Sequence, residues 1–242
     1  MSGQVVIDWF PESRARYRSG WVVVAVDVIR ATTTAVTAVA AGRACYPVAS
    51  LAAARELAAR LERPLLVGEL DGDVPSEFDL DNSPAALSRR TDVERPAVLL
   101  STTGTRLLAG VASSTAVHAA CLRNLTAQVR RLVIGRHQRV AVIGAGSRGE
   151  FRAEDQLACA RIAAGLVEAG YQPGGPTAEL LARWRGVPVD VLAGGASAAY
   201  LRRTGRLEDL DFILGHVDDL DATFEMNGSG LEMVPAAGRR PA

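Results

Sequence analysis

The stretch Trp21–Thr34 reads WVVVAVDVIRATTT and decides the fold. Its first six residues are apolar and mostly β-branched, which predicts a buried strand over Trp21–Val26. Asp27 and Arg30 follow the strand, and three threonines then open a helix. A strand, a polar loop and a helix in this order form the repeating unit of an α/β protein. In such folds ligands bind beyond the carboxyl ends of the strands, so the loop after Val26 is a candidate site.

The same alternation continues along the chain and predicts an α/β fold, a three-layer α/β/α arrangement with a mostly parallel or mixed sheet. We expect a single domain over residues 1–237 with a C-terminal elaboration. The other predicted strands are Gln4–Ile7, Ala44–Val48, Pro64–Val67, Ala97–Leu100, Ala116–Ala119 and Arg139–Ile143. The predicted helices are Thr33–Ala41, Ser50–Leu61, Pro84–Arg90, Thr105–Ala109, Asn124–Arg131, Glu154–Ala169, Thr177–Trp184 and Ala196–Arg203.

The C-terminal region breaks this pattern. A turn over Pro173–Pro176 leaves the main α/β part, and a strand pair is predicted at Ala222–Met226 and Leu231–Pro235. The residues between these two strands are Asn-Gly-Ser-Gly, which favour a hairpin. Residues 238–242 are expected to form a disordered tail.

Composition excludes several function classes. The net charge is +0, so no nucleic acid or membrane partner is expected. All 27 basic residues are arginine, which excludes a Schiff-base lysine and a Walker-type phosphate lysine. The three cysteines are widely spaced, as in reduced thiols, and no signal peptide or membrane-spanning run is evident. We therefore expect a cytoplasmic protein, for which a homodimer is a candidate assembly.

Four polar clusters come directly after predicted strands. In the first, the Asp27 carboxylate suits Mg²⁺ and the Arg30 guanidinium suits phosphate oxygens, although the threonines could simply cap the helix. In the second, Glu69 precedes an acidic loop that could equally be a solvated loop. In the third, Thr102–Arg106 surrounds Gly104, where backbone N–H groups can face a ligand or merely form a turn.

The fourth cluster is the glycine run Gly144–Gly149. Its spacing matches the G-x-G-x-x-G pattern of dinucleotide sites, but no second strand ends in an acid about twenty residues later. Glu154 and Asp155 follow at the start of a helix, where acids are also ordinary partners of the helix dipole. We expect the run to shape the turn that delivers these two carboxylates.

Together these clusters resemble the 2-phosphosulfolactate phosphatase family over about residues 20–165. The motif from Val26 to Thr34 is nearly verbatim. The other matching patterns are Gly68-Glu69, Phe78-Asp79-Leu80 with Asn82-Ser83-Pro84, Thr102 with Gly104-Thr105-Arg106, Leu122-Arg123-Asn124, and Ala145-Gly146 with Glu154-Asp155. The resemblance implies an α/β/α fold, Mg²⁺ dependence, and hydrolysis of 2-phospho-3-sulfolactate to 3-sulfolactate and phosphate. The sequence departs from the family at Asp81, usually Gly, and at Thr103, usually Asn.

On this basis we expect the catalytic residues to be Asp27, Arg30 and Arg106. Arg30 is assigned to the phosphoryl group and Arg106 to the sulfonate or carboxylate. The expected Mg²⁺ ligands are Asp27, Glu69, Glu154 and Asp155, of which one or both of the last two bind. The expected contacts to a small anionic substrate are Thr32, Thr33, Asn82, Ser83, Thr102, Thr103, Gly104, Thr105 and Asn124.

Two questions stay open at this level. Asp27 could instead attack phosphorus, but the haloacid-dehalogenase pattern needs a second Asp where Ile29 stands, which favours a metal ligand. The chain could also be a non-catalytic anion-binding homologue, or a dinucleotide-binding oxidoreductase that uses Gly144–Gly149.

Overall fold

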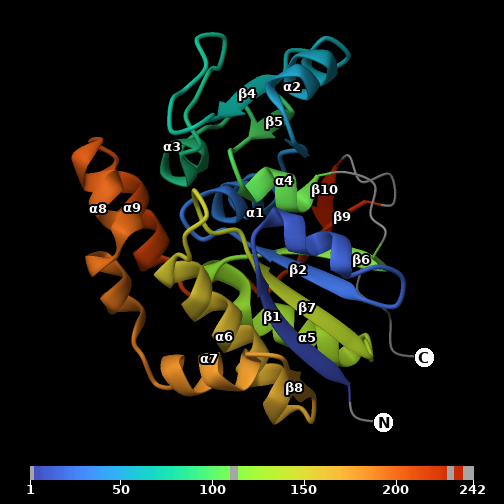
Figure 1. Cartoon of the computed structure of the whole chain (residues 1–242). Coiled ribbons are helices and arrows are strands. Elements are labelled where there is room, and N and C mark those ends of the chain that lie inside the picture. Colours follow the sequence, from blue (N-terminus) through green and yellow to red (C-terminus); the bar gives the residue numbers. More distant parts are fainter. Residues whose placement is uncertain (1–2, 110–113, 228–231, 237–242) are drawn as a thin grey trace.

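A computed structural model describes residues 3–109, 114–227 and 232–236. Its strands form one mixed sheet in the order β4-β5-β3-β10-β9-β6-β2-β7-β1-β8 (Figure 1). The strands are β1 Gln4–Trp9, β2 Val22–Val26, β3 Cys45–Val48, β4 Leu65–Gly68, β5 Ala97–Leu100, β6 Ala116–Ala120, β7 Arg139–Gly144, β8 Gln172–Gly174, β9 Phe224–Met226 and β10 Met233–Pro235. The predicted α/β class and layered arrangement are confirmed.

Strand β2 lies in the interior of the sheet because all five of its residues are apolar and buried. It pairs in parallel with β6 on one side and β7 on the other. Val23 and Ala25 point into one apolar cluster, whereas Val22, Val24 and Val26 point into another on the opposite face. This alternation buries both faces, as expected for a parallel strand between two helical layers.

The helices cover both faces of the sheet. The α-helices are α1 Ala31–Ala40, α2 Leu51–Ala58, α3 Pro84–Ser88, α4 Gly104–Leu108, α5 Leu125–Ile134, α6 Ala153–Glu168, α7 Thr177–Trp184, α8 Ala196–Arg203 and α9 Leu207–Gly215. The short 3₁₀ helices are Pro11–Arg16, Leu122–Asn124 and Val189–Gly194. Residues of α1 and α4 belong to the first apolar cluster, and those of α5 and α6 to the second.

The C-terminal hairpin is built into the middle of the sheet. Strand β9 pairs antiparallel with β6, and β10 pairs antiparallel with both β9 and β3. The parallel strands therefore form two blocks, β4-β5-β3 and β6-β2-β7-β1-β8, joined by the hairpin. The predicted strand pair is present, while its connection at residues 228–231 and the tail at 238–242 lie outside the described residues.

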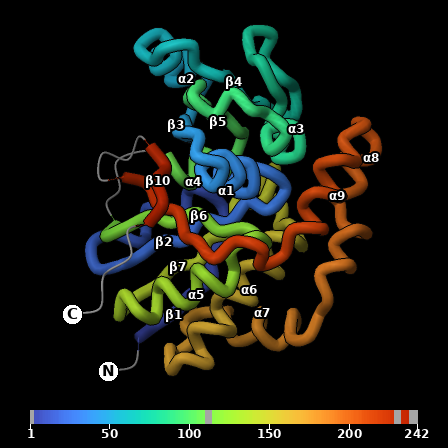
Figure 2. The backbone as a smooth tube through the Cα atoms, turned by 180° about the vertical axis from the view of Figure 1, so that it is seen from behind, coloured from blue at the N-terminus to red at the C-terminus, as the bar shows by residue number. Residues whose placement is uncertain are grey.

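Two elements were not predicted. The segment expected as a turn contains β8, which extends the sheet beyond β1. Helix α9 was also missed, although Leu207, Leu210 and Ile213 repeat at helical spacing and Glu208 and Asp209 occupy the first turn. Helices α8 and α9 stand beside α3 at the side of the sheet, as Figure 2 shows from behind. We call α8 and α9 together the cover helices.

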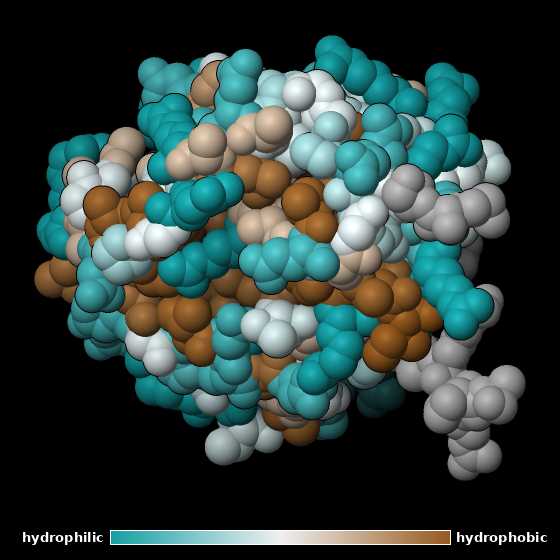
Figure 3. Space-filling model, turned by 90° about the horizontal axis from the view of Figure 1, so that it is seen from below, coloured by the Kyte–Doolittle hydropathy of each residue, from teal (hydrophilic) through white to brown (hydrophobic). Residues whose placement is uncertain are grey.

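The described surface mixes polar and apolar side chains. On the face drawn in Figure 3, apolar groups lie in patches between polar ones. No described helix is both long and apolar enough to cross a membrane.

Candidate active site

Residues that follow four strands, two from each parallel block, line one cavity of ≈ 560 Å³. Asp27 follows β2, Glu69 follows β4, Ser101 follows β5 and Gly146 comes shortly after β7. The cavity is lined by residues 27, 29, 30, 69, 71, 72, 82, 101–103, 146–148, 152, 155, 196, 197, 199–201 and 203. Its volume suits a small molecule. Residues from all four polar clusters of the sequence therefore line this one cavity.

Asp27 is held at the centre of this cavity by its own loop. Its backbone N–H donates to Thr32 Oγ1 at 2.9 Å, and the Ala31 N–H donates weakly to its Oδ1 at 3.3 Å. A Cβ atom at Gly104 would lie 2.1 Å from Asp27 Oδ2, so only glycine leaves room for this carboxylate. Burial, with the charges of Glu69 and Glu154, raises the pKa of Asp27 to about 7.

Two further carboxylates lie buried at the start of α6. Asp155 accepts the Val28 N–H through Oδ1 at 2.9 Å and the Gly146 N–H through Oδ2 at 3.0 Å. Burial and the charges of Asp27 and Glu154 raise the pKa of Asp155 well above its ordinary value. Burial also raises the pKa of Glu154, whose Oε1 is buried with no hydrogen-bond partner among the described residues. The cluster is therefore short of positive charge.

The glycine run shapes this turn. Gly146 has φ +60° and gives its N–H to the Asp155 carboxylate, so that group is not free to bind a pyrophosphate. The first turn of α6 carries Glu154 and Asp155. Negative charge there disfavours a bound phosphate chain, which weighs against a dinucleotide site.

Glu69 ties the third cluster to the second. Its Oε1 accepts the Thr102 N–H at 2.8 Å, and its Oε2 accepts both the Thr102 hydroxyl and the Gly72 N–H at 2.8 Å. Glu69 therefore holds two loops together at the edge of the cavity. Thr103 makes a similar link, since its hydroxyl donates to the Gly146 carbonyl at 3.1 Å.

A divalent cation fits this carboxylate cluster. Within the described ranges, no three Asp, Glu, His or Cys side chains form a ready ligand cage. Mg²⁺ does not need one, because it is usually held by one or two carboxylates with water and substrate phosphate oxygens. Two oxygens have the fewest hydrogen bonds: Asp27 Oδ2, at the cavity lining, and Oε1 of Glu154, which is unpartnered among the described residues. Glu154 does not itself line the cavity, but it neighbours Asp155, which does. The hydrogen bonds of Asp155 and Glu69 suit them to shaping the loops.

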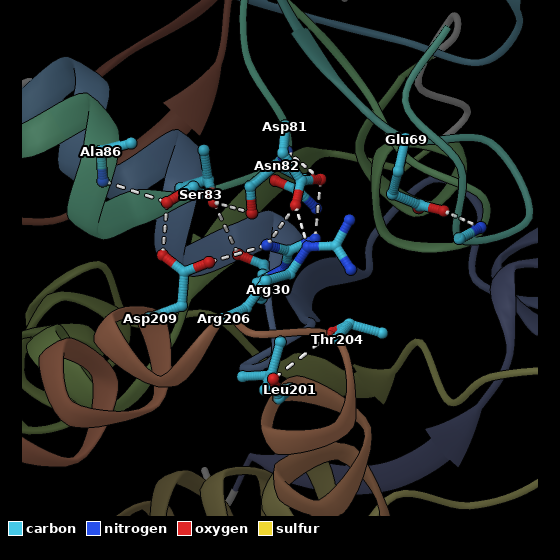
Figure 4. Close-up of polar contacts among 12 residues, drawn as sticks. Arg30, Glu69, Asp81, Asn82, Ser83, Ala86, Leu201, Thr204, Arg206 and Asp209 are labelled. Atoms are coloured by element: carbon cyan, nitrogen blue, oxygen red, sulfur yellow. Dashed lines mark hydrogen bonds and ion pairs between the residues drawn. The ribbon is translucent and has the colours of Figure 1, made fainter.

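Arg30 also lines the cavity, but its charge is shared with two carboxylates (Figure 4). Its Nη1 and Nη2 donate to the two Asp81 oxygens at 2.9 and 2.8 Å, and Nη1 also donates to Asp209 at 2.7 Å. Arg206 forms a second ion pair with Asp81, and the Ser83 hydroxyl donates to Asp209 at 2.5 Å. Burial opposes the charge of Arg30, but these carboxylates raise its pKa above the ordinary value. Asp81, the first departure from the resemblance, is therefore the partner of Arg30.

Several predicted substrate contacts instead stabilise the backbone. The Thr32 and Thr33 hydroxyls donate to the Asp27 and Val28 carbonyls, and Thr105 donates to the Ser101 carbonyl. Ser83 caps α3, and Asn124 accepts the Cys121 N–H. None of these five residues is part of the cavity lining, and neither is Gly104, whose role is to leave room for Asp27. Asn82, Thr102 and Thr103 do line the cavity, and Asn82 Oδ1 is buried without a partner among the described residues.

Arg106 is not brought to the cavity. It lies on α4 with Nη2 3.2 Å from Glu12 Oε1, and the two side chains are 49% and 68% exposed. The residues that sequence reasoning missed are Arg148 and Arg152, between β7 and α6, and Ser197, Tyr200 and Arg203 on α8. Arg148 lies inside the glycine motif and could have been suspected, whereas no local signal marks the α8 residues.

The fold and the cavity define an α/β protein in which buried carboxylates and several arginines surround one cavity of a size that suits a small ligand. The chain belongs to the 2-phosphosulpholactate phosphatase family, whose family model matches residues 9–225.

Three relatives carry the name probable 2-phosphosulfolactate phosphatase. The protein of Synechococcus sp. (strain WH7803) is 32% identical over 78% of this chain and 79% of its own length. That of Deinococcus radiodurans is 34% identical over 79% of this chain and 82% of its own length. That of Pseudothermotoga lettingae is 38% identical over 58% of this chain, an alignment that spans 60% of the relative.

Proposed function

We propose that this protein is a Mg²⁺-dependent phosphatase that hydrolyses 2-phospho-3-sulfolactate to 3-sulfolactate and phosphate. The observation that carries the proposal is the set of buried carboxyl groups Asp27, Glu154 and Asp155, whose pKa values are all raised, beside a cavity lined with arginines. The family and the names of its relatives support the substrate.

In this proposal Asp27 and Glu154 hold the cation. Mg²⁺, when bound, would neutralise phosphoryl charge and make a bound water more acidic. Water adds to phosphorus, the bond between phosphorus and the ester oxygen breaks, and that oxygen of sulfolactate takes up a proton. Asp155 orients the loops after β2 and β7 through its two backbone N–H bonds, so both sides of the site keep one geometry.

The test measures phosphate release from 2-phospho-3-sulfolactate by the full chain. Chelation should abolish release and Mg²⁺ should restore it, and Asp27→Asn should lower kcat/KM by about a hundredfold to a thousandfold. The exposed Asp190 gives the matched control, Asp190→Asn, which should behave as wild type. Full turnover after exhaustive chelation would overturn the metal requirement, and no release with Mg²⁺ present would overturn the function.

A further inference from the structure

Two arginines at the mouth of the cavity differ from Arg30. Arg148 precedes α6, Arg203 ends α8, and both are exposed cavity-lining residues. Within the described part of the chain no carboxylate pairs with either guanidinium. Their charge is therefore free to meet an anion, whereas that of Arg30 is shared with Asp81 and Asp209.

Both arginines are anchored to the loop Asp71–Gly72. Arg148 Nη2 donates to the Asp71 carbonyl at 3.2 Å, and the Tyr200 hydroxyl donates to the next carbonyl, that of Gly72, also at 3.2 Å. The Arg203 guanidinium carbon lies 5.6 Å from the centre of the Tyr200 ring. A cation above an aromatic face is held in place without losing its charge. The loop therefore brings together two cations from distant parts of the sequence.

Arg152 occupies a deeper position. It lines the same cavity with its side chain 17% exposed; its Nη1 lies 3.5 Å from Glu150 Oε2, and its Nη2 donates to the Ser147 carbonyl at 3.4 Å. Its Nε is buried with no hydrogen-bond partner among the described residues. A buried N–H of this kind is costly unless an acceptor reaches it, which points to an oxygen of a bound ligand.

We propose that the cavity has two anion subsites, with Arg152 at the transferred phosphoryl group and Arg148 with Arg203 at the remote sulfonate. The proposal rests on the proposed function for the identity of the ester. Asp71 also lines this edge, so two arginines and one carboxylate lie beside the loop. A sulfonate stays ionised throughout the neutral range, and arginine is the side chain whose charge is equally permanent.

The test compares two esters that differ only in the sulfonate, 2-phospho-3-sulfolactate and 2-phospholactate. Losing a charge-assisted contact should lower kcat/KM for the sulfonated ester about tenfold to hundredfold in Arg203→Ala and in Arg148→Ala. The same variants should lose less than about threefold on 2-phospholactate. Arg152→Ala should impair both esters alike. Arg202→Ala is the matched control, since Arg202 neighbours Arg203 on α8, donates through Nη1 to the Ala193 carbonyl and does not line the cavity.

Equal losses on both esters, or no loss on either, in Arg203→Ala and Arg148→Ala would overturn the subsite. Titration calorimetry with 3-sulfolactate separates this result from a failure of the proposed function. A wild-type protein that releases no phosphate but binds 3-sulfolactate, with binding weakened by Arg203→Ala and unchanged by Arg202→Ala, would keep the subsite and reject the phosphatase. Unchanged 3-sulfolactate binding in Arg203→Ala would reject the subsite.

Discussion

The carboxylates after β2 and β7 and the cover helices face the same cavity, but they are attached to the protein in different ways. Asp27 directly follows the interior strand β2 and accepts the Ala31 N–H, and Asp155, at the start of α6, accepts N–H groups from the loops after β2 and β7. The cover helices pack largely through a small apolar cluster in which Ala198, Leu201 and Leu210 are the buried members, and α9 adds Ile213 to the second core cluster. Their polar connections to the sheet run through Asp209 and Arg206 to Arg30 and Asp81.

We infer from this difference that the carboxylates determine the reaction, whereas the cover helices determine which ester binds. The carboxylates are fixed by the sheet, which contains most of the core. The cover helices contribute Tyr200 and Arg203, and a small apolar cluster and the buried ion pair of Asp209 with Arg30 connect them to the rest of the protein. Changes in the cover helices should therefore alter which ester is accepted more readily than they alter the carboxylate centre.

The strongest test of the comparison is Asp209→Ala. Asp209 is 3% exposed at its side chain and bonds Arg30, Ser83 and the Ala85 N–H. Removing its carboxylate leaves the buried Arg30 with Asp81 alone and takes the acceptor from Ser83 and the Ala85 N–H, so we expect the free energy of unfolding to fall by about 3 kcal/mol or more. Urea unfolding followed by far-ultraviolet circular dichroism measures this.

The control lies one residue earlier on the same helix. Glu208 pairs with Arg89, and both side chains are mostly exposed, at 74% and 62%. Glu208→Ala should cost about 1 kcal/mol or less. If the two variants unfolded at the same urea concentration, the ion-pair network would not be what holds the cover helices.

A second test addresses the carboxylates that are held by the sheet, in particular Asp27. In Gly104→Ala the new methyl group would collide with Asp27 Oδ2 and with Ala31 Cβ, which lies 2.6 Å from it. Overpacking of this kind costs about 1–3 kcal/mol. Because the collision displaces Asp27, kcat/KM should fall alike for sulfonated and sulfonate-free esters. Gly194→Ala is the control, since its Cβ would meet nothing within 4 Å. A variant of Gly104 with wild-type stability and turnover would show that Asp27 is not confined there.

The loops that carry the carboxylates can be predicted from the sequence because short sequence patterns mark them. A buried strand followed at once by Asp27 and Arg30, and a glycine turn followed by Glu154 and Asp155, can be recognised within a few residues. The parallel sheet then brings their ends together, since such strands share one carboxyl edge.

Helix α8 was predicted at its observed bounds, but the position of the cover helices over the cavity could not be predicted in the same way. Arg30 and Asp209 are separated by 179 positions, and neither α8 nor α9 differs locally from an ordinary surface helix. The hairpin Phe224–Pro235 shows the same limit: its turn residues indicate a strand pair, but not that the pair lies between β3 and β6. Such choices depend on complementary surfaces formed only in the folded chain.

The smallest expected effect belongs to Arg106→Ala, although the motif assigns Arg106 to the remote anion. In the structure its guanidinium pairs with Glu12 at the surface, and an exposed pair contributes about 0–1 kcal/mol. The free energy of unfolding should therefore change by less than about 1 kcal/mol. On 2-phospho-3-sulfolactate, kcat/KM should change less than about threefold, because Arg106 does not line the cavity.

Glu12→Ala distinguishes the loss of the surface ion pair between Arg106 and Glu12 from the loss of a substrate contact. If Arg106 acts only through that pair, both variants should give the same small change, and 2-phospholactate should show no contrast with the sulfonated ester. A loss above about tenfold for Arg106→Ala, confined to the sulfonated ester and absent in Glu12→Ala, would place the sulfonate at α4. The remote anion would then bind to the sheet-side helix α4, and Arg148 and Arg203 would lose the role proposed for them. Substrate specificity would then come from the part of the site held by the sheet, and not from the cover helices.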